Sequence, residues 1–173
     1  WVDTGIFAGV RGHFNLGGQN VLAVVKDSLL SISRTSLTQT TVGTLLTSTG
    51  PVQMEENPTQ VMLVDGKFGY VYDKPGATLI QITDPDFPIP ASLTYQDGYG
   101  IIVERDTGRF FISAINDFTP WDALDFATAE AAPDSAVAVL SNQQDLLVFG
   151  QRTTEPFVDT GNADFPFERR AGA

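Results

Sequence analysis

The sequence of 173 residues contains no cysteine and a single histidine, His13. A disulfide framework and a thiolate metal site are therefore excluded, and histidine-based metal sites or catalytic triads have at most one candidate. Basic residues are also few, with 10 Lys and Arg against 21 Asp and Glu, which gives a net charge of −11. This balance disfavours a nucleic-acid binder, because such proteins use Lys and Arg to displace phosphate counterions.

Long hydrophobic runs are missing as well. No apolar stretch approaches the roughly 20 residues that span a bilayer, and no basic-then-apolar leader opens the chain, so we expect no membrane partner. The first residue is Trp1 rather than an initiator methionine. We therefore expect the chain to be a processed or partial piece of something longer.

What the sequence does contain is a recurring strand–turn–strand unit. The 16 glycines and 10 prolines of the whole sequence favour many turns over long helices. Asp65-Gly66 and Asp97-Gly98 are strong hairpin signals, because glycine supplies the positive φ that a tight turn needs. With Asp27 and Asn142 marking the other two hairpins, the unit recurs at intervals of about 40 residues, which is typical of propeller blades.

We therefore predict an all-β fold of β-propeller-like repeats built from antiparallel hairpins, forming a partial propeller. The repeat units are predicted roughly at residues 20–60, 61–92, 93–135 and 136–173, as a single all-β domain or part of one larger propeller domain. Propellers protect their strand edges by radial closure, so we expect missing blades to come from absent residues, other chains or neighbouring copies. The alternative is a chain that closes on itself as a small barrel or a four-bladed ring.

The segment 119–132 follows a different pattern. Thr119 as N-cap and Pro120 at the first helical position predict a short helical turn over 119–125, followed by an extended stretch. Aromatic residues in such a segment are either core residues, which is the plainer interpretation, or part of a binding surface. The candidate assembly or packing anchors are Trp121, Phe126, Asp122, Asp125 and Glu130.

The stretch from Trp121 to Glu130, followed by Pro133-Asp134, resembles the tail-hub proteins of short-tailed bacteriophages, which are also called packaged-DNA stabilisation proteins. The likeness continues through Leu147-Val148-Phe149-Gly150 and Thr154-Glu155 to Phe165-Pro166-Phe167-Glu168-Arg169, and it is strongest over residues 95–170. The resemblance implies a structural protein of the virion tail, made in the host cytoplasm. It implies neither an enzyme nor a cofactor.

The same resemblance implies a set of partners. Copies of the protein would form a ring below the portal and join the portal or adaptor to the tail needle or fibre proteins. Packaged DNA would pass without sequence-specific binding. The negative charge then serves either solubility alone or an acidic wall to which DNA does not adhere.

Two other classes of function stay open, a β-propeller carbohydrate-active hydrolase and a generic propeller binding module. The tripeptide Asp-Thr-Gly, a signature of aspartic proteases, occurs at Asp3, Asp106 and Asp159. Such proteases need two of these loops face to face, whereas Asp106 falls in a predicted hairpin turn. Turn chemistry is the simpler explanation of the motif, and no catalytic, cofactor-binding or metal site is predicted.

Overall fold

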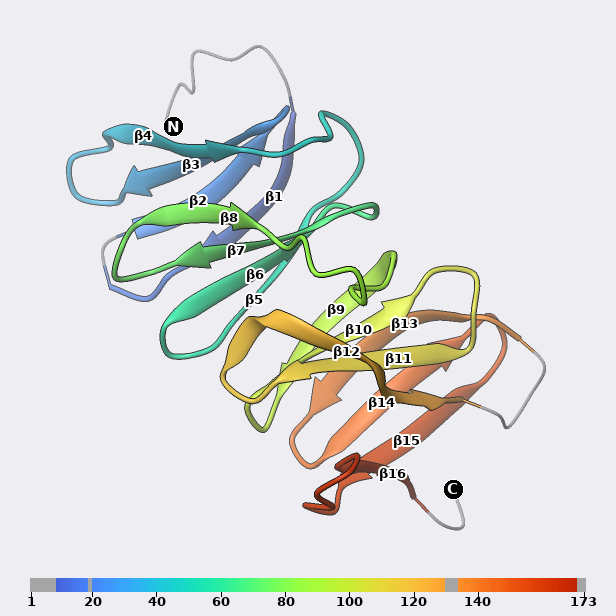
Figure 1. The fold of residues 1–173 in the computed structure, drawn as a ribbon. Coiled ribbons are helices and arrows are strands. Elements are labelled where there is room, and N and C mark those ends of the chain that lie inside the picture. The colour runs from blue at the N-terminus through green and yellow to red at the C-terminus, as the bar shows by residue number, and fades with distance from the viewer. Residues whose placement is uncertain (1–8, 19, 130–133, 171–173) are drawn as a thin grey trace.

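A computed structural model describes residues 9–18, 20–129 and 134–170 of the chain (Figure 1). In these residues sixteen β-strands form four separate four-stranded antiparallel sheets, and no helix is present. Strands that follow one another along the chain are neighbours within each sheet. We call the sheets blades 1 to 4, and they follow one another from blade 1 at the top of Figure 1 to blade 4 at the bottom.

The strands of each blade have the following bounds. Blade 1 contains β1 (Val10–Asn15), β2 (Asn20–Val25), β3 (Ser28–Ser33) and β4 (Gln39–Thr44). Blade 2 contains β5 (Gln53–Glu56), β6 (Gln60–Val64), β7 (Gly69–Asp73) and β8 (Thr78–Gln81). Blade 3 contains β9 (Pro90–Gln96), β10 (Tyr99–Glu104), β11 (Arg109–Ala114) and β12 (Asp117–Thr128). Blade 4 contains β13 (Ala136–Asn142), β14 (Asp145–Gly150), β15 (Thr154–Asp159) and β16 (Phe167–Arg169).

The predicted all-β, propeller-like fold is confirmed, and the hairpin turns fall where the sequence places them. Gly66 and Gly98 have φ angles of +84° and +97°, which a residue with a side chain rarely adopts. The sheets begin and end at residues 10–44, 53–81, 90–128 and 136–169. Whether they are one whole domain or part of a larger propeller stays a prediction.

The predicted helical turn over 119–125 is wrong, because these residues belong to strand β12. Trp121 pairs with Ser113 and Phe126 with Phe111, so the segment covers the edge of β11. The local capping signal is also used differently: the Asp117 carboxylate accepts hydrogen bonds from the Thr119 N–H and hydroxyl, at 3.0 and 2.8 Å. Pairing along an otherwise open strand edge outweighs a weak local preference for helix.

The core consists of three apolar layers, one between each pair of successive blades. Val24 and Tyr72 belong to the layer between blades 1 and 2, and Met62 and Phe118 to the layer between blades 2 and 3. The third layer joins blades 3 and 4. Blades 2 and 3 are therefore buried on both faces, and this is why their central strands are continuous apolar runs rather than alternating ones.

The first strand of each blade lies beside the first strand of the next, and side chains link these strands across the gap. Each link is a backbone N–H of the following blade that donates to a side-chain oxygen of the preceding one. The links are Leu93 N to Gln53 Oε1 at 2.7 Å, Val139 N to Ser92 Oγ at 3.2 Å, and Ser141 N to Thr94 Oγ1 at 3.1 Å. They satisfy donors that pair with no strand of their own sheet.

Blades 1 and 2 approach each other differently. The Val52 N–H donates directly to the Arg11 carbonyl at 3.0 Å, without a side chain between them. A Cβ added at Gly12 would lie 2.2 Å from the Val52 carbonyl oxygen, which no real contact allows. Glycine is therefore required at position 12 for the backbones to meet.

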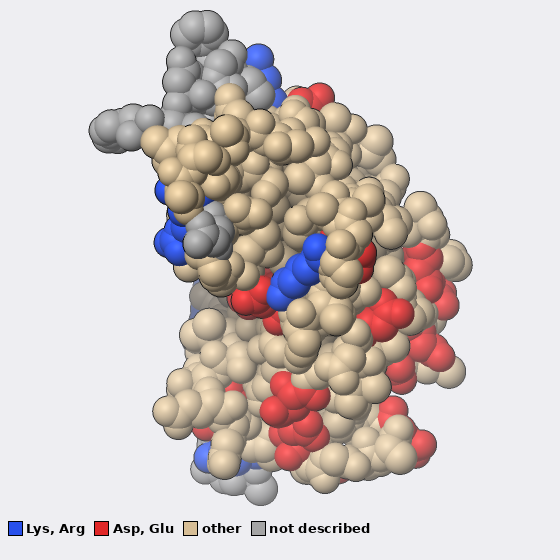
Figure 2. All heavy atoms as spheres, turned by 90° about the vertical axis from the view of Figure 1, so that its left-hand side faces the viewer, with Lys and Arg blue, Asp and Glu red and all other residues tan. Residues whose placement is uncertain are grey.

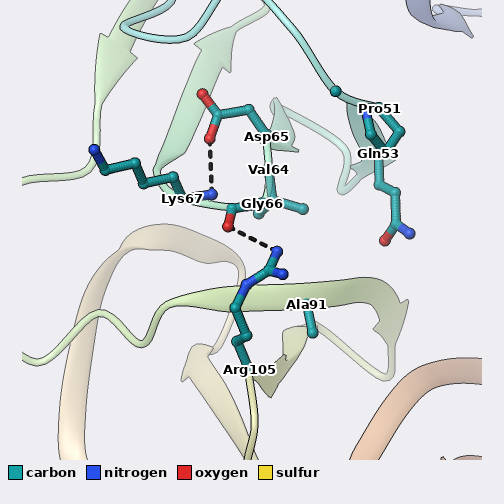
Figure 3. A pocket seen from close by; sticks show the side chains of 9 residues that line it. Pro51, Gln53, Val64, Asp65, Gly66, Lys67, Ala91 and Arg105 are labelled. Carbon is teal, nitrogen blue, oxygen red and sulfur yellow. Dashed lines mark hydrogen bonds between the residues drawn. The ribbon is translucent and has the colours of Figure 1, made fainter.

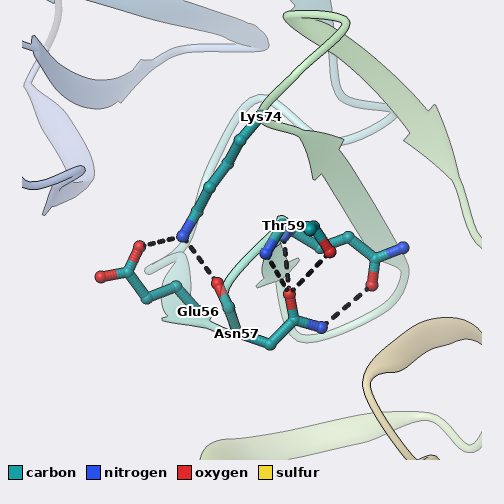
Figure 4. Close-up of polar contacts among 5 residues, drawn as sticks. Glu56, Asn57, Thr59 and Lys74 are labelled. Atoms are coloured by element: carbon teal, nitrogen blue, oxygen red, sulfur yellow. Dashed lines mark hydrogen bonds and ion pairs between the residues drawn. The ribbon is translucent and has the colours of Figure 1, made fainter.

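Asn57 lies at the turn between β5 and β6, where it joins a group of polar contacts in blade 2 (Figure 4), and it also ties blade 2 to blade 3. Its side chain is buried, and its carboxamide oxygen accepts from the Thr59 and Gln60 N–H groups at 2.9 and 2.7 Å. Its amide nitrogen donates to the Asn116 carbonyl of blade 3 at 3.1 Å. Lys74 donates to the Asn57 carbonyl at 2.6 Å and forms an ion pair with Glu56 of blade 2.

Gln60 makes a second link at the same junction. Its amide nitrogen donates to the Asp117 carboxylate at 3.1 Å, and its side-chain oxygen accepts the Phe118 N–H at 2.9 Å. Burial opposes ionisation of Asp117, but the hydrogen bonds from Gln60 and Thr119 outweigh it and lower the pKa of the carboxyl below its usual value. The start of β12 is thus held by blade 2 as well as by its own sheet.

Replacing Asn57 by alanine is expected to lower the free energy of unfolding by about 2–3 kcal/mol, because it removes a buried side chain and leaves three backbone groups at the blade 2–blade 3 junction without their partner. Denaturant unfolding followed by circular dichroism measures the change. Asn162→Ala is the matched control, since Asn162 makes a similar local hydrogen bond at an exposed turn. Its expected effect is within about 0.5 kcal/mol. Equal losses in the two variants would contradict the role given to Asn57.

Candidate assembly site

The candidate site is a bulge in β12, the outermost strand of blade 3. Phe126 pairs with Phe111 and Trp121 with Ser113, so that Ile112 alone in β11 faces the four residues 122–125. The extra residues cannot join the ladder, and they form a bulge of the outer strand. Bulges at sheet edges commonly re-aim side chains, and here they present the tip residues Asp122 to Asp125.

Trp121 anchors the N-terminal end of the bulge. Its side chain is buried, and the indole N–H donates to the Phe118 carbonyl at 2.9 Å. Its backbone N–H donates to the Asp84 carboxylate at 3.1 Å, which ties it to the loop between blades 2 and 3. Phe87 of that loop packs edge-on against the indole, with ring centres 5.1 Å apart.

Phe126 anchors the C-terminal end of the bulge. Its ring packs on Phe111 with centres 5.4 Å apart. The Arg109 guanidinium lies 5.3 and 5.2 Å from the centres of the two rings, close enough for a cation–π contact with each. Glu104 orients this arginine by accepting its Nε–H at 2.8 Å.

The tip of the bulge combines one apolar side chain with two carboxylates. Leu124 is 81% exposed, more than the other large apolar residues in the described part of the chain. The Asp122 carboxylate accepts the Leu124 N–H at 2.8 Å, which fixes the turn beneath the leucine. Partial burial, and then the charge of Asp122, raise the pKa of the Asp125 carboxyl. We call residues 122–125 the knob.

The structure divides the candidate residues into two groups. Trp121 is buried and Phe126 half-buried, each packed against an aromatic ring, whereas Asp122 is exposed and Asp125 half-buried at the tip. Glu130 lies outside the described residues. Sequence reasoning missed Leu124 and Arg109. The signal for Leu124 was the leucine between two aspartates, which is out of place in a buried strand; Arg109 carried no signal before its ring partners were known.

A cavity of about 300 Å³ lies between blades 2 and 3, close to the β6–β7 turn (Figure 3). Arg105 of blade 3 reaches across and donates to the Gly66 carbonyl at 2.8 Å. Asp65 points away from this arginine; it accepts the Tyr70 hydroxyl at 3.1 Å, and burial raises the pKa of Tyr70 to about 12. Of the two hydrogen bonds drawn there, the one between Arg105 and Gly66 joins the two blades.

Other sites considered from the sequence are widely placed. Asp106 lies in the β10–β11 turn and Asp159 at the end of β15, while Asp3 is outside the described residues. Among the residues that the structure describes, no group of three or more His, Cys, Asp or Glu side chains could hold a metal ion. The described part of the chain also has no helix long and apolar enough to cross a membrane.

Four blades of four antiparallel strands, stacked face to face, define a β-propeller type of protein. The chain belongs to the phage stabilisation family described as Bacteriophage P22 Gp10, beta-propeller, whose model matches residues 2–173. The resemblance to phage tail proteins is thereby confirmed at the level of the family. No curated protein matches the chain.

Solved structures show the same fold at low sequence identity. The computationally designed Ika4 protein has a TM-score of 0.63 at 9% identity, with 90% of this chain and 94% of that chain covered. The N-terminal domain of Nup159 has a TM-score of 0.57 at 14% identity, with 93% of this chain and 47% of that chain covered. A structural genomics protein from Bacteroides thetaiotaomicron has a TM-score of 0.60 at 14% identity, with 94% of this chain and 43% of that chain covered. The chain thus spans about half the length of the Nup159 domain.

The different roles of anchor and tip lead to opposite expectations for stability. Trp121→Ala should lower the free energy of unfolding by about 3–5 kcal/mol, because it empties a buried site. Leu124→Ala should change it by less than about 0.5 kcal/mol, because the side chain is exposed. Urea unfolding followed by far-UV circular dichroism measures both. A large loss on truncating Leu124 would show that the knob is part of the core.

Proposed function

We propose that this chain is a structural part of a phage tail hub, which assembles with copies of itself and joins the portal or adaptor to the tail needle or fibres. The observation that carries the proposal is the match of the phage stabilisation family over residues 2–173. The family belongs to the virion, and its description concerns stabilisation rather than catalysis. Position in the tail, ring formation and the named partners go beyond that match and are part of the proposal.

The fold suits a role in which the protein resists mechanical force. Apolar layers and polar links join each blade to the next, so force on one blade is carried into its neighbours through buried contacts. A tail component that retains DNA under pressure needs this kind of rigidity. Exposed residues of the outer strands remain available for contacts with other proteins.

The charge suits a passage for DNA. With 21 acidic and 10 basic residues, the protein has a net charge of −11 and repels phosphates overall. Figure 2 shows Asp and Glu spread over the lower and right-hand parts of one face. DNA that passes such a surface is not retained by counterion release, so retention has to come from closing the passage rather than from binding.

The proposal is tested on particles of the phage that encodes the chain. Particles that lack the protein should package DNA and then lose it to added nuclease, whereas complemented particles should protect it. Gold-labelled antibody should place the protein at the head–tail junction in electron micrographs. Full nuclease protection without the protein, or label distributed over the capsid, would refute a tail-hub role.

A further inference from the structure

Blade 1 carries an exposed patch opposite in character to the knob. Val10 and Leu46 are 57% and 63% exposed, and Lys26 is exposed as well. Val10 pairs with Val25, the residue before Lys26. The Leu45 N–H, one residue before Leu46, donates to the Asp27 carbonyl at 2.6 Å. These contacts place the backbone around the three residues at one end of blade 1, and we call Val10, Lys26 and Leu46 the blade 1 patch.

Arg11 makes the blade 1 patch rigid. Its guanidinium donates to the carbonyls of Lys26 at 2.6 Å, Thr47 at 2.7 Å and Gly50 at 2.7 Å. It also donates to the Thr47 hydroxyl at 2.8 Å and the Thr49 carbonyl at 2.7 Å, so that all five acceptors are neutral. The Thr47 hydroxyl in turn donates to the Asp65 carboxylate at 2.6 Å. The patch therefore combines two exposed apolar side chains with the exposed Lys26 and the underlying Arg11, and the exposed Asp27 follows Lys26 in the chain.

The charges of the two blades have opposite sign. Residues 9–50 contain three basic residues, Arg11, Lys26 and Arg34, and one acidic residue, Asp27. Residues 90–128 contain two basic residues and six acidic ones, and two of those six, Asp122 and Asp125, flank Leu124. In Figure 2 the upper part of the molecule carries Lys and Arg, while Asp and Glu predominate lower down. A chain with net charge −11 therefore has one blade that attracts acidic surfaces.

We infer that two copies of the chain bind head to tail, with the knob of one seated on the blade 1 patch of the next. Leu124 contacts Val10 and Leu46 of the neighbour, and the two aspartates face its Lys26 and Arg11. Because the two surfaces differ, the contact is heterologous, and repeated contacts build a ring if the rotation closes or a filament if it does not. This inference rests on the self-assembly in the proposed function and names the surfaces that would produce it.

Charge reversal tests the inference in the purified chain. The association is measured by light scattering and sedimentation velocity over a range of protein concentrations, at low and at high salt. Asp122→Lys combined with Asp125→Lys should weaken it about tenfold or more, and Lys26→Glu should do the same, because like charges then face each other. An equimolar mixture of the two variants should recover it, since each knob then meets a patch of opposite charge.

Matched controls separate the surfaces from general effects of charge and hydrophobicity. Asp164→Lys reverses an exposed aspartate outside the knob, and Leu37→Ser removes an exposed leucine outside the patch. Both should leave the association unchanged, whereas Leu124→Ser should weaken it about tenfold. Circular dichroism confirms that each variant is folded.

Three results would overturn the inference: a chain that stays monomeric at every concentration, an association that survives reversal of the knob, or a mixture that fails to recover. An association that survives reversal would leave the tail-hub proposal intact and move its contact elsewhere. Conversely, if the particle experiment refuted the tail-hub role, a head-to-tail contact measured in solution would still be valid. The two experiments therefore fail separately.

Discussion

The hydrogen bonds between the first strands of successive blades are the constraint on which the rest of the structure depends. Each blade has an inner edge whose N–H groups have no partner in their own sheet. Gln53, Ser92 and Thr94 supply acceptors for these groups in the next blade, and Gly12 lets a backbone carbonyl do the same. Once the inner strands are placed in register, the apolar faces of the blades meet and the three layers of the core form.

This arrangement explains why the candidate assembly site lies at the outer edge. An insertion of several residues in a strand buried between blades would disturb two apolar layers. The outermost strand pairs on one side only, so β12 can carry a four-residue bulge. Trp121 and Phe126 fix the two ends of this bulge. The rigid interior is thus the reason that the knob has a defined position, which a contact surface requires.

Local signals in the sequence were sufficient for the fold class and for the hairpins. Asp-Gly turns and continuous apolar runs depend on backbone conformation and burial, which act over a few residues. The helix signal of Thr119 and Pro120 was misleading, because pairing with the open edge of β11 decided their conformation instead of local helix propensity. Leu124 and Arg109 acquire their roles from neighbours in space, and the acceptors Gln53, Ser92 and Thr94 look like ordinary polar residues until the next blade is beside them.

Amide hydrogen exchange resolved by residue tests the central claim most directly. If side-chain acceptors close the inner edges, the Leu93, Val139 and Ser141 amides should exchange as slowly as ladder amides such as that of Ile102. Protection of Val139 should fall selectively in Ser92→Ala, while Leu93 stays protected. Fast exchange at all three amides in the unmodified chain, at the rate of exposed strand edges, would contradict the account.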